Sequence, residues 1–344
     1  MKKAVSSAPA QRLGSLELGR LIAASLVVIS HLVSLDAAPG PLGVQYFFVL
    51  SGFVMISAHH GDFGRWRGPL TFWWRRVCRI YPLYWLMLLP VMFYYYHGLA
   101  PAGTNWALFS LTPRVVNDLI PPAWTLRFEV AFYIMFGLCL LPHVGRVILA
   151  GWVLSVLWLL VPIPVFRFFH IHRYNIMFLR AVGLNNHFIS VFELYFFAGL
   201  LGGWLLLKSR PSIILALAGL LIGGALMFIK LKVTQWGYVY PRPLDLAVLS
   251  LGYAGVMFGF AMLERCGIFR LGKWAAWAGA ISYPLYISHS LPLLAADKLL
   301  PAPLRANILV EGVLLLLIYA VAIWLAFNVD RPLQRMLRRG AKNA

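Results

Sequence analysis

The sequence has few charged residues, and few of those are acidic. Only 12% of its 344 residues are charged, with 11 Asp and Glu against 30 Lys and Arg, while 61% are hydrophobic. Soluble domains are about one quarter charged and nearly half apolar. The chain also lacks a polar stretch long enough to form a soluble domain. We therefore exclude a soluble protein and predict one integral-membrane domain over residues 1–344.

Cysteine is scarce as well. The chain has three, Cys78, Cys139 and Cys266, with no CxxC pair. This spacing excludes a disulfide framework and a zinc site. The Walker, Rossmann and HExxH motifs are also missing, and the loop histidines lack accompanying carboxylates. We therefore expect no bound metal and no bound cofactor.

Long apolar runs are abundant, and the mean hydropathy is +0.78. A helix needs about 20 apolar residues to cross the hydrocarbon core of a bilayer. The runs predict an all-α, polytopic transmembrane bundle of about ten spans. We expect these spans near 16–36, 43–60, 80–97, 124–142, 146–165, 189–207, 211–230, 244–263, 277–297 and 307–328.

The net charge of +19 raises the question of nucleic-acid binding. A nucleic-acid binder needs its basic residues on one patch, whereas here they form short clusters between apolar runs, so we expect no nucleic-acid partner. With ten spans and both termini cytoplasmic, the cytoplasmic segments hold roughly twice as many Lys and Arg as the opposite loops, as membrane topology requires. Residues 1–13 and 333–344 are then basic cytoplasmic tails. A cleaved signal peptide is the alternative for the first 35 residues, but their apolar run is long for one.

Ionisable residues inside spans are costly and commonly mark function. Arg20 and His31 are eleven residues apart, so they lie on one face of the first helix, ~16 Å apart along its axis. Together they favour a site. The alternatives are a histidine satisfied by a neighbouring helix and an arginine that extends to the lipid headgroups.

Two further clusters lie at the starts of spans three and four. Arg76 and Arg79 project the same way on a helix and can bind phosphates by bidentate contacts; the alternative is an ordinary cytoplasmic anchor. Glu129 lies one turn before Tyr133 in an apolar helix, and its carboxylate needs a partner. A structural ion pair with Arg127 or Arg20 is the alternative to a functional role. Weaker candidates are Ser51, which with Gly52 also suits close helix packing, Tyr283 and His289.

Taken in order along the chain, these segments resemble the acyltransferase-3 family of bacterial membrane acyltransferases over about residues 14–332. Arg20 and His31 match its arginine–ten residues–histidine motif, and Arg76 and Arg79 match its R-x-x-R motif. The other matching segments are Gly43 to Gly52 (G-x-x-x-F-F-x-x-S-G), Trp124 to Glu129 (W-S-L-x-x-E, with Thr125 in place of serine) and Ser282 to His289 (S-Y-x-L-Y-x-x-H). Among its members the chain resembles the stand-alone exopolysaccharide acetylases.

The resemblance implies transfer of an acyl group, most often acetyl, from the co-substrate acyl-CoA to a carbohydrate hydroxyl, in the bacterial cytoplasmic (inner) membrane. The acceptor would be a cell-surface or exported glycan that a lipid carrier can present, and membrane lipids surround the enzyme. His31 is our candidate general base, and Glu129 is the second candidate catalytic residue. Its carboxylate would either fix the tautomer of His31 or position the acceptor, and the sequence does not decide between these roles. Arg20, Arg76 and Arg79 are the expected acyl-CoA-binding residues. The expected substrate pocket contains Ser51, Trp124, Tyr133, Tyr283 and His289.

The main alternative is a proton-coupled transporter or flippase for a lipid-linked glycan. His31, Glu129 and Glu193 would then form a proton relay. Such a protein should show repeat symmetry between its halves, which the sequence lacks, and it should not bind CoA.

Overall fold

The computed structural model of the chain describes residues 13–33, 40–66, 68–97, 102–112, 118–158, 187–190, 192–233, 243–305 and 307–343. Throughout this described part the secondary structure is helical, without a strand, which confirms the predicted all-α class. Helices suit such an apolar chain because each satisfies its own backbone hydrogen bonds where the bilayer offers none. The end of the predicted span 146–165 and most of the loop after it lie outside the described residues.

The helices of the amino-terminal half are α1 (Gly14–Leu32), α2 (Gly40–His59), a short 3-10 turn (His60–Asp62), α3 (Gly68–Tyr96), α4 (Ala102–Ser110), α5 (Ala123–Cys139) and α6 (Gly145–Leu157). Those of the carboxy-terminal half are α9 (Glu193–Lys208), α10 (Ile213–Val233), α11 (Pro243–Arg265), α12 (Gly272–Ser288), α13 (Ser290–Leu299), α14 (Ala302–Arg305), α15 (Ile308–Leu325) and α16 (Arg331–Asn343). One π-helical turn, Ala326–Asp330, joins α15 to α16.

Five stretches of the described chain are long and apolar enough to cross a membrane: Gly14–Leu32, Gly40–Asp62, Gly68–Tyr96, Leu244–Arg265 and Ile308–Leu337. Shorter apolar helices occupy Gly145–Leu157 and Ile213–Ile229. Large apolar side chains also point outward, such as Ile214, which is 80% exposed, and Leu316, which is 72% exposed. Lipid is the solvent that such a surface fits. The count of ten spans and the cytoplasmic placement of the termini stay predictions.

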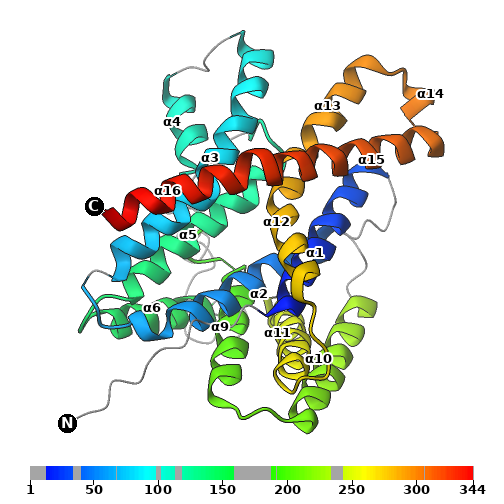
Figure 1. Cartoon of the computed structure of the whole chain (residues 1–344). Coiled ribbons are helices and arrows are strands. Elements are labelled where there is room, and N and C mark those ends of the chain that lie inside the picture. The colour runs from blue at the N-terminus through cyan, green and yellow to red at the C-terminus, as the bar shows by residue number, and fades with distance from the viewer. Residues whose placement is uncertain are drawn as a thin grey trace, which may run out of the picture.

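The packing order places the first helix beside the last ones. α1 packs against α2 and α12, α2 packs against α9, and α9 packs against α11, which in turn packs against α10. α12 contacts α15, and α16 lies across α3 at the front of the molecule (Figure 1). Segments from both ends of the chain therefore surround the same interior.

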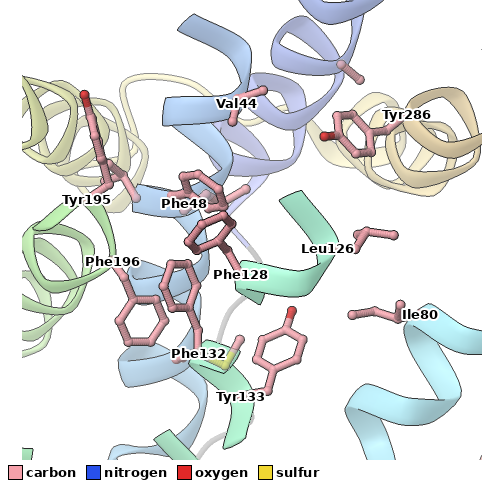
Figure 2. Close-up of a cluster of buried hydrophobic side chains, with 14 of the residues drawn as sticks. Val44, Phe48, Ile80, Leu126, Phe128, Phe132, Tyr133, Tyr195, Phe196 and Tyr286 are labelled. Carbon is pink, nitrogen blue, oxygen red and sulfur yellow. The ribbon is translucent and has the colours of Figure 1, made fainter. Parts of the chain in front are cut away.

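Aromatic side chains fill the core between α2, α5 and α9. Phe48 of α2 contacts the edges of Phe128 and Phe132 of α5, at ring separations of 6.0 and 5.5 Å. Phe132 stacks on Phe196 of α9 at 4.7 Å, as Figure 2 shows. Behind them α2 and α9 approach closely at glycine, since a Cβ on Gly52 would stand 1.9 Å from the Phe196 carbonyl oxygen. The packing role predicted for Gly52 is thus confirmed.

Four helix boundaries differ from the predicted spans. α3 begins at Gly68 rather than near residue 80, so Arg76 and Arg79 lie within the helix and not at its start. The predicted span 277–297 is divided at His289 into α12 and α13. α1 ends at Leu32, which puts His31 in its last turn rather than deep in a span reaching residue 36. The predicted tail after residue 332 continues as α16, because the helix passes through its π turn without a break.

Candidate active site

A cavity of about 750 Å³ opens between α1, α3, α12 and α16. Its lining is strongly basic and includes Arg20, Arg76, Arg79, Arg331 and Arg335. The first three are the arginines that the sequence assigns to donor binding, and the structure brings them together from two helices. From the sequence, Arg331 and Arg335 are only basic residues that favour a cytoplasmic carboxy terminus, because nothing there shows that the chain returns to the site after its last apolar run.

The carboxylates of this outer cavity already have partners within the protein. Glu17 lies 3.5 Å from Arg20. Glu264 accepts hydrogen bonds from the backbone nitrogens of Gly14 and Ser15, at 2.7 and 2.9 Å, and so caps the start of α1. Asp330 accepts from the Gln334 amide nitrogen at 2.9 and 2.8 Å. The five arginines of the lining outnumber these three carboxylates, so the cavity keeps an excess of positive charge that an anion can neutralise.

Arg76 is held on one side by His59, the last residue of α2. An Nη2 hydrogen of Arg76 points at His59 Nε2, 3.2 Å away, and His59 Nδ1 lies 2.8 Å from Asp62 Oδ2. Because Nε2 must accept, Nδ1 carries the proton and donates it to the carboxylate. The rings of Phe72 and Tyr133 lie 5.2 and 5.1 Å from the guanidinium. These contacts fix one side of Arg76 and leave its buried Nε without a protein partner.

An inner cavity of about 50 Å³ follows the outer one. Arg20 and Arg79 line both cavities, so they mark the junction between them. The inner lining comes from α1, α2, α3, α5 and α12 and contains the predicted residues Ser51, Glu129 and Tyr283 together with Ile80, Leu126 and Tyr286. Figure 2 shows Ile80, Leu126 and Tyr286 on three different helices facing this space.

Glu129 is the carboxylate of the inner cavity. Its Oε1 accepts a hydrogen bond from Ser51 Oγ at 3.4 Å and another from the hydroxyl of Tyr133. Arg20 and Arg76 are within its electrostatic range. The alternative of an ion pair with Arg127 is wrong, because Arg127 binds Asp118 instead, with Nη2 2.6 Å from Oδ1. Glu129 therefore belongs to the arginine cluster at the junction.

His31 and His289 form a pair farther along α1. Their ring centroids are 5.1 Å apart, and the His289 ring lies 6.2 Å from that of Tyr286. Each Nδ1 lies 2.8 Å from a carbonyl oxygen of its own helix segment, of Val27 for His31 and of Tyr286 for His289. A carbonyl only accepts, so each Nδ1 carries the proton and each Nε2 presents a lone pair. His289 is fully buried, and its Nε2 has no hydrogen-bond partner among the residues that the structure describes.

The structure shows no hydrogen bond between Glu129 and His31, each of which bonds to other residues. The Val27 carbonyl fixes the tautomer of His31, while Glu129 bonds to Ser51 and Tyr133. His31 itself is exposed at the end of α1 and lines neither cavity. Tyr286 lines the inner cavity, and its ring contacts that of His289, which in turn contacts that of His31.

Trp124 packs outside the inner cavity, 6.1 Å from Phe128 and 6.0 Å from Phe192. The next residue of the W-S-L-x-x-E motif makes the polar contacts instead. Thr125 Oγ1 bonds to the Tyr286 hydroxyl at 2.5 Å and donates to the Pro122 carbonyl at 2.8 Å. That geometry fits the threonine that replaces the serine of the motif. In the described residues, no group of three or more His, Cys, Asp or Glu side chains is arranged to hold a metal ion.

The fold and these clusters define a helical protein with membrane-spanning segments, a basic cavity and an interior set of polar side chains. The sequence matches the family described as "Acyltransferase domain" over residues 13–328, and the chain belongs to this acyltransferase family. The membership confirms the resemblance carried by the motifs.

Two curated relatives are similar to the chain. It is 27% identical to the exopolysaccharide production protein ExoZ of Rhizobium meliloti, over 75% of this chain and 78% of that protein. It is 32% identical to the acyltransferase MdmB of Streptomyces mycarofaciens, over 29% of this chain and 28% of that protein. The chain thus spans under a third of MdmB but most of ExoZ. No solved structure matches it significantly.

Proposed function

We propose that this chain is a membrane O-acyltransferase that moves an acyl group, acetyl in the simplest case, from acyl-CoA to a hydroxyl of a cell-surface or exported carbohydrate. The observation that carries the proposal is the basic outer cavity, which meets the inner cavity at Arg20 and Arg79. CoA consists of a polyanionic nucleotide followed by a thin, uncharged pantetheine arm. The basic outer cavity suits the nucleotide, and the small inner cavity behind it suits the arm. The similarity to a protein named for exopolysaccharide production supports a carbohydrate acceptor.

The donor enters the outer cavity with its phosphates on the arginines, which bind phosphate oxygens by paired N–H groups. Its pantetheine arm then passes the junction and runs along α1. The arm is roughly as long as four residues of extended chain, ~14 Å. The axial rise from Arg20 to His31 is ~16 Å. A donor anchored at the junction therefore carries its thioester close to the histidine pair.

His31 acts as the general base. The Val27 carbonyl holds the Nδ1 proton, so Nε2 is ready to accept one. It removes the proton of the acceptor hydroxyl while the hydroxyl oxygen attacks the thioester carbonyl. The C–S bond then breaks, and the imidazolium returns the proton to the sulfur of CoA. A base in this position contributes about 10²–10⁴-fold in rate.

His289 binds the acceptor beside His31. Its Nε2 is a buried acceptor without a partner in the described part of the chain, and an unsatisfied polar atom of this kind costs about 1–3 kcal/mol. A second hydroxyl of the sugar would satisfy it when the acceptor is bound. The two histidines thereby position adjacent hydroxyls, one to react and one to anchor.

Glu129 is a positioning residue in this scheme. It lies among Arg20, Arg76 and Arg79, whose mutual repulsion it offsets. Its hydrogen bonds to Ser51 and Tyr133 fix the carboxylate on the wall of the inner cavity. It thus keeps the guanidinium groups in place at the junction through which the arm passes.

Binding of labelled acetyl-CoA and its transfer to candidate glycans, measured with purified protein in nanodiscs, test the proposal. Loss of both guanidiniums in Arg76→Ala with Arg79→Ala should weaken acetyl-CoA binding by roughly tenfold to a hundredfold. Added salt should reduce the difference in affinity between this variant and the wild-type protein. Arg75→Ala is the matched control, because Arg75 is exposed and does not line the cavity. Wild-type protein that fails to bind acetyl-CoA would reject the proposal and favour a lipid-linked-glycan transporter.

The base assignment has its own test. The His31→Ala protein should insert and bind acetyl-CoA with unchanged affinity, yet transfer no acyl group. Normal product formation by this variant would refute the role of His31 while leaving the donor site intact.

A further inference from the structure

The outer cavity has two basic walls that come from opposite ends of the chain. One wall contains Arg20 of α1 and Arg79 of α3. The other contains Arg331 and Arg335, which belong to α16, the helix that lies across α3 in Figure 1. The two walls face a single space of about 750 Å³, which is larger than one phosphate group requires.

Only one of the two walls also lines the inner cavity. Arg20 and Arg79 also line the inner cavity, whereas Arg331 and Arg335 line the outer cavity alone. A ligand that reaches inward must therefore pass the first wall, and the second wall contacts only what remains outside.

The second wall is preorganised by local structure. Arg331 and Arg335 are four residues apart, so they project from the same face of α16. Arg331 donates to the Ala276 carbonyl at 2.9 Å, and its guanidinium carbon lies 4.4 Å from the Phe327 ring centroid. Directly before it stands the π-helical turn Ala326–Asp330, a distortion that is frequent at functional sites.

CoA carries its phosphates at two places. The diphosphate is bonded directly to the pantetheine arm, while a separate monophosphate is attached to the ribose. Because the arm enters the inner cavity, the diphosphate stays at the junction with Arg20 and Arg79. The ribose phosphate is then left in the outer part of the cavity.

We propose that Arg331 and Arg335 form a subsite for the ribose 3′-phosphate of the acyl-CoA donor. The inference rests on the proposed function, since it assumes that donor. It assigns to α16 the discrimination between CoA thioesters and simpler pantetheine thioesters that lack the ribose phosphate.

The experiment compares acetyl-CoA with 3′-dephospho-acetyl-CoA as ligands of the purified protein in nanodiscs. Wild-type protein should bind acetyl-CoA roughly tenfold to a hundredfold more tightly, the range for hydrogen bonds to a charged group. Arg331→Ala with Arg335→Ala should lose that preference by weakening acetyl-CoA binding while leaving the affinity for the dephospho compound unchanged. This unchanged affinity also shows that the variant is folded.

The matched control is Arg270→Ala with Lys273→Ala, which removes two exposed charges near the cavity that do not line it. This control should keep the wild-type preference for acetyl-CoA over 3′-dephospho-acetyl-CoA. Equal affinity of the wild-type protein for the two thioesters would overturn the subsite without any variant. An equal loss of affinity for both thioesters in the Arg331→Ala, Arg335→Ala variant would also overturn the subsite. It would indicate that the two arginines bind a lipid headgroup or act only through their general charge. Failure to bind either thioester would count against the proposed function itself.

Discussion

Replacing Arg127 by methionine should destabilise the protein without altering its donor site. The Arg127 side chain is 2% exposed. Its Nε and Nη2 donate to the Asp118 carboxylate at 2.6–3.2 Å, and its Nη1 donates to the carbonyl oxygens of Ala107 and Thr112 at 2.9 and 2.7 Å. Methionine fills a similar volume but leaves a carboxylate and two carbonyls without their donor.

The size of the effect follows from these contacts. Removing one partner of a buried ion pair costs about 3–5 kcal/mol, and at about 2–4 °C per kcal/mol the thermal midpoint should fall by at least ~6 °C. Arg127→Met with Asp118→Asn should recover part of the loss, because the uncompensated charge is gone. Arg75→Met, a control that removes an exposed arginine, should unfold at nearly the wild-type temperature. Thermal unfolding in detergent micelles measures all three, and an Arg127→Met midpoint within 2 °C of wild type would refute the argument.

Three further outcomes are expected. Glu129→Gln should raise the KM for acetyl-CoA and leave the pH profile of kcat unchanged, because Glu129 faces the arginines and not His31; a shifted kcat profile would contradict this. Gly52→Leu should prevent stable folding, since even a Cβ there meets the Phe196 carbonyl oxygen at 1.9 Å, and a normal yield of folded protein would be the contrary result. His59→Ala should weaken acetyl-CoA binding by a few-fold without changing kcat, because Arg76 loses the acceptor 3.2 Å away; equal affinities would show that Arg76 needs no support.

The sequence alone was sufficient for the fold class and for several of the charged and polar residues that line the two cavities. Apolar runs of membrane length dictate helices, because a lipid-exposed backbone must satisfy its own hydrogen bonds. The spacing of Arg76 and Arg79 places them on one helix face, and their grouping with Arg20 as donor-binding residues follows from the resemblance to the acyltransferase-3 family. Ser51, Glu129 and Tyr283 similarly line one inner cavity.

The parts that the sequence did not reveal depend on tertiary structure. Arg331 and Arg335 look like topological charges until α16 is seen to lie across α3. His59 is 17 residues from Arg76, with which it shares a hydrogen bond, and no periodic pattern links the two. The end of α1 at Leu32 also escaped prediction, since the apolar run continues past it.

The order in which the donor cavity is completed has a consequence for synthesis and truncation. Arg20 lies in the first helix of the described chain and Arg335 in the last one, so the cavity closes only when translation has reached the final segment. A protein shortened before Arg331 would retain its histidine pair and the wall of Arg20 and Arg79, but it would lack the second wall of the cavity. Under the proposed subsite, such incomplete chains would bind acetyl-CoA more weakly and would no longer distinguish it from its 3′-dephospho form.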